Sequence, residues 1–353
     1  MKQVVFVSLF LSAVLPFGRP HQFWQTPGSA KSDQTIKLGV DLVVLDALVL
    51  NKKTGRLIGG LRKDDFTIFE DGVRQQITNF SQDALPLSIV ILIDTSSSVW
   101  PFINQIRQNA LQALEQLKQV DEVALIATAA RTEVVQDFTT DKLLVAERIK
   151  NIDATALGDD GILLHEAIYQ AAAHFHKAAN PDSRRAIIAI TDDMSTQRVA
   201  SQGHSEKEAF NELYESDVVV CGLLAGDYSQ KRKIENRYKT KWYDPVGLIF
   251  SGPMQPYSPF GPGSILTYAK DTGGIVKEVD KGDASAKLAD IITQLRSRYS
   301  FGYVSSNAKM DGKLLRKIKL TVSSVVEKRE GKLSILTRRG YYTRTNTYTG
   351  TAK

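Results

Sequence analysis

Residues 88–98 read Ser-Ile-Val-Ile-Leu-Ile-Asp-Thr-Ser-Ser-Ser, and this stretch decides the expected fold. Residues 89–93 form a continuous apolar run, which is typical of a strand covered on both faces of a sheet. In residues 103–117, which follow, the apolar side chains are spaced as the stripe of an amphipathic helix. The stretch therefore predicts a buried strand, a polar loop and a helix, the repeating unit of a parallel α/β sheet.

The same alternation continues through the middle of the chain. Further strands are expected at 122–129, 132–138, 185–190, 217–224 and 273–276, and further helices at 143–152, 163–175, 206–215 and 284–298. Repeated strand–helix units of this kind predict a doubly wound, mostly parallel sheet in an α/β domain.

The segments on either side of this region carry strand patterns. Residues 36–80 alternate apolar and polar positions, and Asp71-Gly72 favours a tight hairpin turn. Residues 301–342 return to strands. Because neither segment is long enough to form a good core alone, we hypothesise that they pair into one small β-sandwich beside the α/β domain. The expected divisions are 1–30 signal peptide and leader, 31–84 N-terminal β segment, 85–299 α/β domain, 300–343 C-terminal β segment, and 344–353 disordered tail.

The first residues indicate export. Lys2 precedes the apolar run from Val4 to Phe17, which is too short for a comfortable membrane span. We therefore expect a signal peptide and a periplasmic or secreted protein, with a buried N-terminal strand or helix as the alternative. We expect no integral membrane span after signal removal, because no later segment is long and apolar enough.

Composition narrows the class of protein. The chain has 353 residues and a formal net charge of +6, with basic residues scattered along it, so a nucleic-acid-binding surface is not expected. The single cysteine, Cys221, lies in an apolar strand pattern, cannot form an internal disulfide and is expected to pack as a small core side chain.

Polar side chains follow two of the expected strands at their carboxyl ends. Asp94, Ser96 and Ser98 follow the first strand, and Asp192 follows the strand at 185–190. Because the carboxyl ends of parallel strands form the ligand face of such a sheet, we expect these four side chains to meet there. Hydroxyl and carboxylate oxygens suit a hard cation, so the pattern predicts a site for Mg²⁺, with Mn²⁺ or Ca²⁺ equally acceptable on chemistry alone.

The D-x-S-x-S loop and the later Thr191-Asp192 pair resemble the metal-ion-dependent adhesion site of von Willebrand factor type A (VWA) domains. Residues 53–56, 60–66 and 69–75 look like the entry segment of the VWFA-related acidobacterial domain family, and residues 299–303 with 338–342 look like its closing segment. The resemblance implies a binding protein in which Ser96 and Ser98 ligate a cation that accepts an Asp or Glu side chain of a protein partner.

One position departs from the family pattern. VWA domains usually supply a threonine hydroxyl at the start of a central helix, and the matching position here is Ile162, which has no ligating atom. A water could substitute, Asp159 or Asp160 could reach the metal, Thr155 could do so from further upstream, or the site could be degenerate. The competing interpretations are that Asp159 and Asp160 cap the helix and that Ser96–Ser98 cap the helix after the loop.

Three classes of function follow from these patterns. A metal-dependent adhesion-type protein is expected first, and a structural or assembly protein of the cell envelope with a metal-free VWA core is the alternative. A hydrolase is less expected, because no G-x-S-x-G, H-E-x-x-H or phosphate-loop motif is present, although His165 and Glu166 lie near the site. The basic and aromatic residues of 227–263 suggest a long loop that either contacts an acidic partner or is a mobile surface segment.

Overall fold

The computed structural model describes residues 42–82, 85–153, 157, 162–193, 203–225, 264–279, 282–307 and 315–342. Residues Asp41–Lys353 form one compact unit. The expected signal segment, the expected loop at 227–263 and the expected tail lie outside the described residues. None of the described helices is long and apolar enough to cross a membrane.

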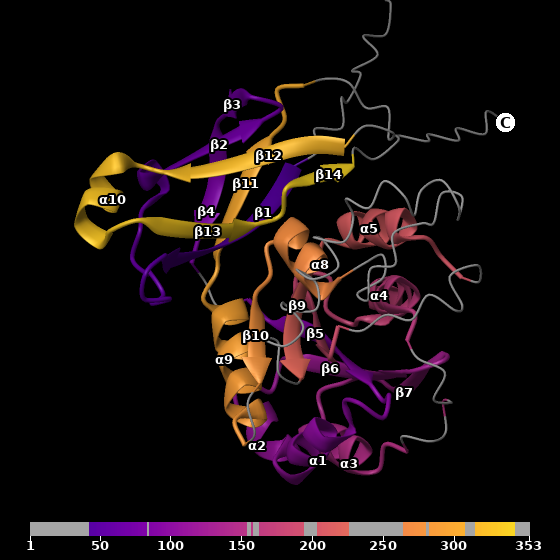
Figure 1. Ribbon diagram of the computed structural model, residues 1–353. Coiled ribbons are helices and arrows are strands. Elements are labelled where there is room, and N and C mark those ends of the chain that lie inside the picture. Colours follow the sequence, from indigo (N-terminus) through magenta and orange to yellow (C-terminus); the bar gives the residue numbers. More distant parts are fainter. Residues whose placement is uncertain are drawn as a thin grey trace, which may run out of the picture. The chain divides into compact units, whose positions relative to one another are not determined.

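A six-stranded sheet forms the centre of the α/β domain, with the order β10-β9-β8-β5-β6-β7 (Figure 1). Every neighbouring pair is parallel except β6 and β7, which are antiparallel. The strands are β5 (Leu87–Asp94), β6 (Glu122–Thr128), β7 (Thr132–Thr139), β8 (Arg184–Thr191), β9 (Val218–Ala225) and β10 (Val276–Val279). The doubly wound, mostly parallel sheet predicted from the sequence is confirmed.

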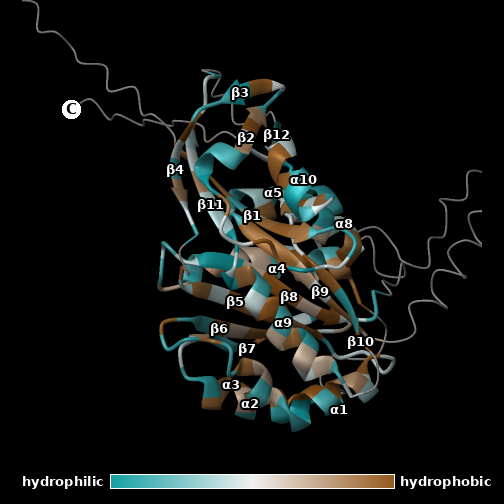
Figure 2. Cartoon of the chain, turned by 90° about the vertical axis from the view of Figure 1, so that its left-hand side faces the viewer, coloured by the Kyte–Doolittle hydropathy of each residue, from teal (hydrophilic) through white to brown (hydrophobic). Residues whose placement is uncertain are grey.

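The central strands are mostly apolar, as expected where helices cover both faces of the sheet. Ile89, Ile91 and Ile93 of β5 belong to one hydrophobic core, whereas Val90 and Leu92 belong to the other. The first core includes side chains of α1 (Trp100–Gln108), α2 (Ala110–Leu114), α3 (Lys142–Lys150) and α9 (Ala284–Arg296). The second includes side chains of α4 (Leu164–Ala173), the 3₁₀ turn His174–Lys177, α5 (Glu206–Glu215) and α8 (Ile265–Thr272). Figure 2 shows the hydrophobic strands enclosed between these helices.

Two helical details differ from the sequence prediction. The single helix expected at 103–117 is divided at Asn109, whose backbone (φ −122°, ψ 20°) leaves the helical region between α1 and α2. Helix α8 was not predicted. Cys221 is fully buried in β9, as expected, and remains a free thiol.

The N- and C-terminal segments form two antiparallel sheets, as predicted. Their orders are β13-β1-β11-β4 and β14-β12-β2-β3. The strands are β1 (Leu42–Asn51), β2 (Phe66–Glu70), β3 (Val73–Gln75), β4 (Ile77–Ser81), β11 (Tyr299–Val304), β12 (Leu315–Val322), β13 (Leu333–Thr337) and β14 (Gly340–Tyr342). Asp71 and Gly72 form the predicted β2–β3 turn, both with positive φ. The connections also contain the 3₁₀ turn Lys63–Asp65 and α10 (Ser324–Glu330).

A third hydrophobic core fills the sandwich. Alternate residues of β1, including Val43 and Leu45, pack with Phe66 and with Tyr299 and Phe301 of β11. Both terminal segments contribute to each sheet, because β1 pairs with β11 and β12 pairs with β2. The two segments therefore form one core, and neither builds a core alone.

Candidate metal and ligand site

Two strand ends bring the predicted acids together. Ile93 lies opposite Ile190 in the parallel pairing of β5 with β8, so Asp94 and the Thr191-Asp192 pair follow at the same edge of the sheet. Both carboxylates are buried, with 1% of Asp94 and 6% of Asp192 exposed. The predicted meeting of the acids at the carboxyl ends of the strands is therefore present in the structure.

The carboxylate of Asp94 is held from two sides. Its Oδ1 accepts a hydrogen bond from the backbone N–H of Ser96 at 2.9 Å, which tightens the turn after β5. Its Oδ2 accepts a hydrogen bond from the hydroxyl of Thr191 at 2.8 Å. These contacts fix the orientation of Asp94 and link the ends of the two strands.

Burial makes the negative charge of Asp94 costly. Desolvation, followed by repulsion from Asp192, raises the pKa of Asp94 from 3.8 to about 6, although hydrogen bonds from Ser96 and Thr191 act in the opposite direction. A buried pair of acids of this kind is stabilised by a cation, which lowers the electrostatic cost of both charges. The charge arrangement therefore fits a divalent cation.

The two serine hydroxyls also fit such an ion. Ser96 Oγ and Ser98 Oγ lie 3.2 Å apart on the exposed side of the loop. Two oxygens at adjacent corners of an octahedron around Mg²⁺ are separated by about 3.0 Å, as expected for metal–oxygen distances near 2.1 Å. The alternative that Ser96–Ser98 cap the next helix is not the arrangement observed, because the N-cap of α1 is Val99, which makes no side-chain capping bond.

Ile162 lies in the hydrophobic core. Only 2% of its surface is exposed, and it packs with Leu164 at the start of α4 and with Leu92 of β5. The position that carries a threonine in the resembling family is thus a core position in this chain. Thr155, Asp159 and Asp160, the substitutes considered from the sequence, lie outside the described residues.

Carboxylates alone do not form a metal site in the part of the chain that the structure describes. Within the described ranges, no group of three or more His, Cys, Asp or Glu side chains is placed to hold a metal ion. The candidate site instead combines two hydroxyls, those of Ser96 and Ser98, as direct ligands with two carboxylates, those of Asp94 and Asp192, that act through water or orient the hydroxyls.

Two neighbouring residues have roles that were not predicted from the sequence. Thr191 bonds Asp94, and its Oγ1 also accepts the backbone N–H of Asp193 at 3.0 Å. Asp193 accepts hydrogen bonds from Ser264 and from the backbone of Ile265 at the start of α8. The β5–β8 pairing could have indicated Thr191 as a neighbour of Asp94, whereas the contact of Asp193 depends on a helix 72 positions along the chain.

Glu166 contacts a histidine other than its neighbour in sequence. Its Oε2 accepts from the backbone N–H of His204 at 2.5 Å and lies 3.0 Å from His204 Nδ1. Burial raises the pKa of Glu166, but hydrogen bonds from His204 and Gln170 outweigh burial and lower it. His165 is buried in the first turn of α4. Across the described ranges, no hydrogen bond joins a histidine to Ser96 or Ser98, so the arrangement does not resemble a serine–histidine catalytic pair.

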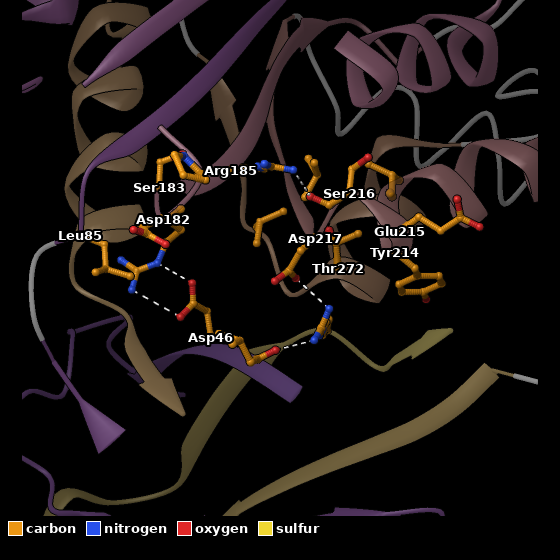
Figure 3. A pocket seen from close by; sticks show the side chains of 17 residues that line it. Asp46, Leu85, Asp182, Ser183, Arg185, Tyr214, Glu215, Ser216, Asp217 and Thr272 are labelled. Atoms are coloured by element: carbon orange, nitrogen blue, oxygen red, sulfur yellow. Dashed lines mark hydrogen bonds and ion pairs between the residues drawn. The ribbon is translucent and has the colours of Figure 1, made fainter. Parts of the chain in front are cut away.

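A cavity of about 450 Å³ lies at the opposite, amino ends of β8 and β9. Figure 3 shows Asp46 and Asp217 on its lining, each joined to an arginine. Arg184 Nε lies 2.5 Å from Asp46 Oδ2, and Arg338 Nη1 lies 2.8 Å from Asp217 Oδ1. Because these charges are paired with one another, the cavity is a weaker candidate for a charged ligand than the Asp94 site.

Comparison with known proteins agrees with this architecture. Residues 89–195 match the family model of the von Willebrand factor type A domain. No curated protein matches the chain in sequence.

Several solved structures are similar to part of the chain. The conserved hypothetical protein BatB from Bacteroides thetaiotaomicron has 19% sequence identity and a TM-score of 0.43, covering 59% of this chain and 98% of its own. An aerotolerance-related membrane protein from Bacteroides fragilis has 18% identity and a TM-score of 0.41, covering 59% and 99%. Proximal thread matrix protein 1 from the mussel byssus has 13% identity and a TM-score of 0.41, covering 61% and 49%.

Proposed function

Because residues 89–195 form a von Willebrand factor type A domain, which fits a role in protein interaction, we propose that this protein is an exported, adhesion-type binding protein without catalytic activity. Asp94, Ser96, Ser98 and Asp192 hold a divalent cation, Mg²⁺ or alternatively Mn²⁺ or Ca²⁺. The bound cation accepts an Asp or Glu side chain of a protein partner.

The observation that carries the proposal is the buried pair of acids beside two hydroxyls. Ser96 and Ser98 provide neutral oxygens on the exposed side of the loop, where a partner has access. Asp94 and Asp192 lie below them, buried, and balance the positive charge. Neutral donors leave a cation strongly electrophilic, so it attracts a carboxylate from outside.

Thr191 and the backbone of Ser96 orient this arrangement. Their hydrogen bonds occupy one position on each oxygen of Asp94, so the carboxylate cannot rotate away from the loop. Such fixed orientation reduces the ordering cost of binding a cation.

Calorimetric titration of the purified mature chain with Mg²⁺ and with Mn²⁺ tests the metal site. We expect saturable binding in the wild type, loss of binding in Asp94→Asn, and loss of at least tenfold in affinity in Ser96→Ala/Ser98→Ala. Ser97→Ala is the matched control, because it changes a serine of the same loop that is not in the donor set, and it should bind as the wild type does. Equal binding by the wild type and Asp94→Asn would contradict the site.

The partner chemistry needs a second experiment. A displayed peptide library in which each member carries one Asp or Glu, paired with its Asn or Gln counterpart, is selected on immobilised protein. We expect acidic members to be enriched in Mg²⁺ and to be released by EDTA, and we expect no enrichment on Asp94→Asn. Selection of the amide counterparts to the same extent would rule out carboxylate recognition.

Export is proposed from the apolar run between Val4 and Phe17. Fusion of residues 1–40 to a reporter that is active only outside the bacterial cytoplasm should give an active reporter. Leu9→Arg/Leu11→Arg interrupts the apolar run and should abolish the activity, whereas Gln22→Arg lies after the run and should not. Equal activity of the wild-type and Leu9→Arg/Leu11→Arg fusions would refute the signal.

The burial of Ile162 favours one second candidate. A core isoleucine in place of a donor supports a structural or assembly role for a VWA core that binds no metal. Absence of Mg²⁺ and Mn²⁺ binding, together with partner binding that EDTA does not affect, would favour this role over the metal-dependent one.

A further inference from the structure

We propose that Asp193 is a positioning residue that couples the Asp94 site to the start of helix α8, so that cation binding at Asp94 orders the first turn of that helix. The inference rests on the proposed function for its metal-dependent part. It concerns the T-D-D sequence at the end of β8, in which only Asp192 was predicted from the sequence to be a site residue.

The backbone of Asp193 is the first sign of such a role. Its φ of 60° lies in the left-handed region, which glycine adopts freely and which most other residues avoid. Asp193 is also 1% exposed, so the position combines a strained backbone with a buried carboxylate. Such a combination persists where the surrounding contacts compensate for its cost, and it points to a functional constraint.

Helix α8 supplies the compensating contacts. Asp193 Oδ1 accepts the backbone N–H of Ile265 at 2.8 Å, and Oδ2 accepts the hydroxyl of Ser264 at 2.6 Å. The first N–H groups of a helix have no partner within the helix, and a negative charge is favoured at that end. Asp193 therefore supports the first turn of α8 from a strand end outside that helix, together with the N-cap Ser264, whose hydroxyl accepts the backbone N–H of Leu266.

Thr191 joins this contact to the candidate metal site. Its hydroxyl donates to Asp94 Oδ2 at 2.8 Å and accepts from the backbone N–H of Asp193 at 3.0 Å. A continuous series of hydrogen bonds thus runs from Asp94 through Thr191 and Asp193 to Ile265. The side chain of Ile265 also packs directly against Gly222 of β9, so a shift of the first turn of α8 reaches the neighbouring strand.

A cation at Asp94 acts on one end of this series. When it holds the carboxylate in one position, the hydroxyl of Thr191 and the backbone of Asp193 are held as well, and the first turn of α8 opens less often. By linkage, a partner that contacts the start of α8 strengthens cation binding by the same factor. The coupling makes α8 a part of the ligand-binding face of the domain.

Asp193→Gly tests the coupling, because glycine keeps the left-handed backbone and the Asp193 N–H while it removes both bonds to α8. The measurement is hydrogen exchange of the amides of residues 265–268, with EDTA and with saturating Mg²⁺. In EDTA we expect exchange in Asp193→Gly to be at least roughly tenfold faster than in the wild type, because roughly tenfold is the factor for one buried hydrogen bond and the substitution removes two. Mg²⁺ should slow this exchange in the wild type and leave it unchanged in Asp193→Gly.

Thr191→Val tests the middle of the series, because Thr191 makes no hydrogen bond to the described residues of α8 and valine has nearly the same shape. We expect faster exchange at residues 265–268 in EDTA, and also weaker Mg²⁺ binding by calorimetry. Asp141→Gly is the matched control: it removes an aspartate that caps α3 through Leu143 and Leu144, so it should speed exchange in α3 and leave α8 and Mg²⁺ affinity unchanged.

The outcomes separate this inference from the proposed function. Unchanged α8 exchange in Thr191→Val would overturn the coupling whether or not metal binds. Mg²⁺ binding to the wild type without any slowing of α8 exchange would overturn the coupling and support the metal site. No Mg²⁺ binding to the wild type would overturn the metal site and the metal-dependent ordering, while faster α8 exchange in both variants would support the hydrogen-bond series itself.

Discussion

In the absence of metal, the substitution Asp94→Asn should lower the free energy of unfolding at pH 4 and raise it at pH 7. The folded protein keeps the Asp94 proton up to about pH 6, whereas the unfolded chain loses it near 3.8. Between these pH values the folded state binds more protons, so rising pH lowers the free energy of unfolding. The stability that protonated Asp94 provides is therefore present below pH 4 and lost by about pH 7.

The magnitude follows from the raised pKa. The pKa rises from 3.8 to about 6, a difference of about two, and each pKa unit corresponds to about 1.4 kcal/mol, so ionised Asp94 destabilises the metal-free protein by about 3 kcal/mol at pH 7. Asparagine removes this charge, but it can accept only one of the two hydrogen bonds from Ser96 and Thr191, which costs about 1 kcal/mol. We expect Asp94→Asn to be more stable than the wild type by about 2 kcal/mol at pH 7 and less stable by about 1 kcal/mol at pH 4.

Urea denaturation in EDTA at the two pH values measures this difference, because other titrating groups are common to both proteins. Asp141→Asn is the control, since asparagine caps a helix as well as aspartate does, and it should change stability by less than about 0.5 kcal/mol at pH 7. Saturating Mg²⁺ should stabilise the wild type and not Asp94→Asn. A loss of stability in Asp94→Asn of the same size at both pH values would refute the reasoning.

Three further expectations follow. Mg²⁺ affinity should fall roughly tenfold between pH 7 and pH 5, because the cation must then displace the Asp94 proton, and calorimetry that shows equal affinity would contradict this. Ile162→Thr should lower the free energy of unfolding by about 1–2 kcal/mol because a hydroxyl replaces the buried ethyl group, and Mg²⁺ titration of this variant should show whether a hydroxyl here strengthens binding. Arg298→Met should raise the free energy of unfolding by about 1 kcal/mol, since the buried Nε and Nη1 atoms of Arg298 lack hydrogen-bond partners among the described residues. Arg184→Met should instead lower it by about 3 kcal/mol, because it leaves the Asp46 carboxylate without its arginine. Chemical denaturation distinguishes the two signs.

The sequence predicted the elements whose pattern is local. The bounds predicted for β5 and α5 are close to the observed ones. A strand buried on both faces is a continuous apolar run, and a helix buried on one face has apolar residues at helical spacing, so both patterns are visible in the sequence. The break at Asn109 was not predicted, since the apolar spacing continues across it from α1 to α2. A stripe indicates which face is buried, but it does not indicate where the backbone leaves the helix.

The positions of the two acids in the candidate site could also be predicted from the sequence, whereas the surroundings of Ile162 could not. The sequence placed Asp94 and Asp192 at the ends of parallel strands, and the register of β5 with β8 brings them to one edge. Ile162 could be recognised from the sequence as a missing donor, but its packing in the core could not, because an isoleucine at a helix start is compatible with either a surface or an interior position.

Asp193 shows why the rest could not be predicted. From the neighbouring residues alone, Asp193 in Thr191-Asp192-Asp193 could be interpreted as a turn residue or as a further acidic residue of the metal site. Its carboxylate instead accepts the first backbone N–H of α8, which has eight residues and is too short to be stable alone. The position of α8 therefore depends on a contact across the sheet edge, and that contact exists only once β8 and β9 are paired. The role of Asp193 therefore could not be predicted without α8, because both of its hydrogen bonds in this region come from Ser264 and Ile265 at the start of that helix.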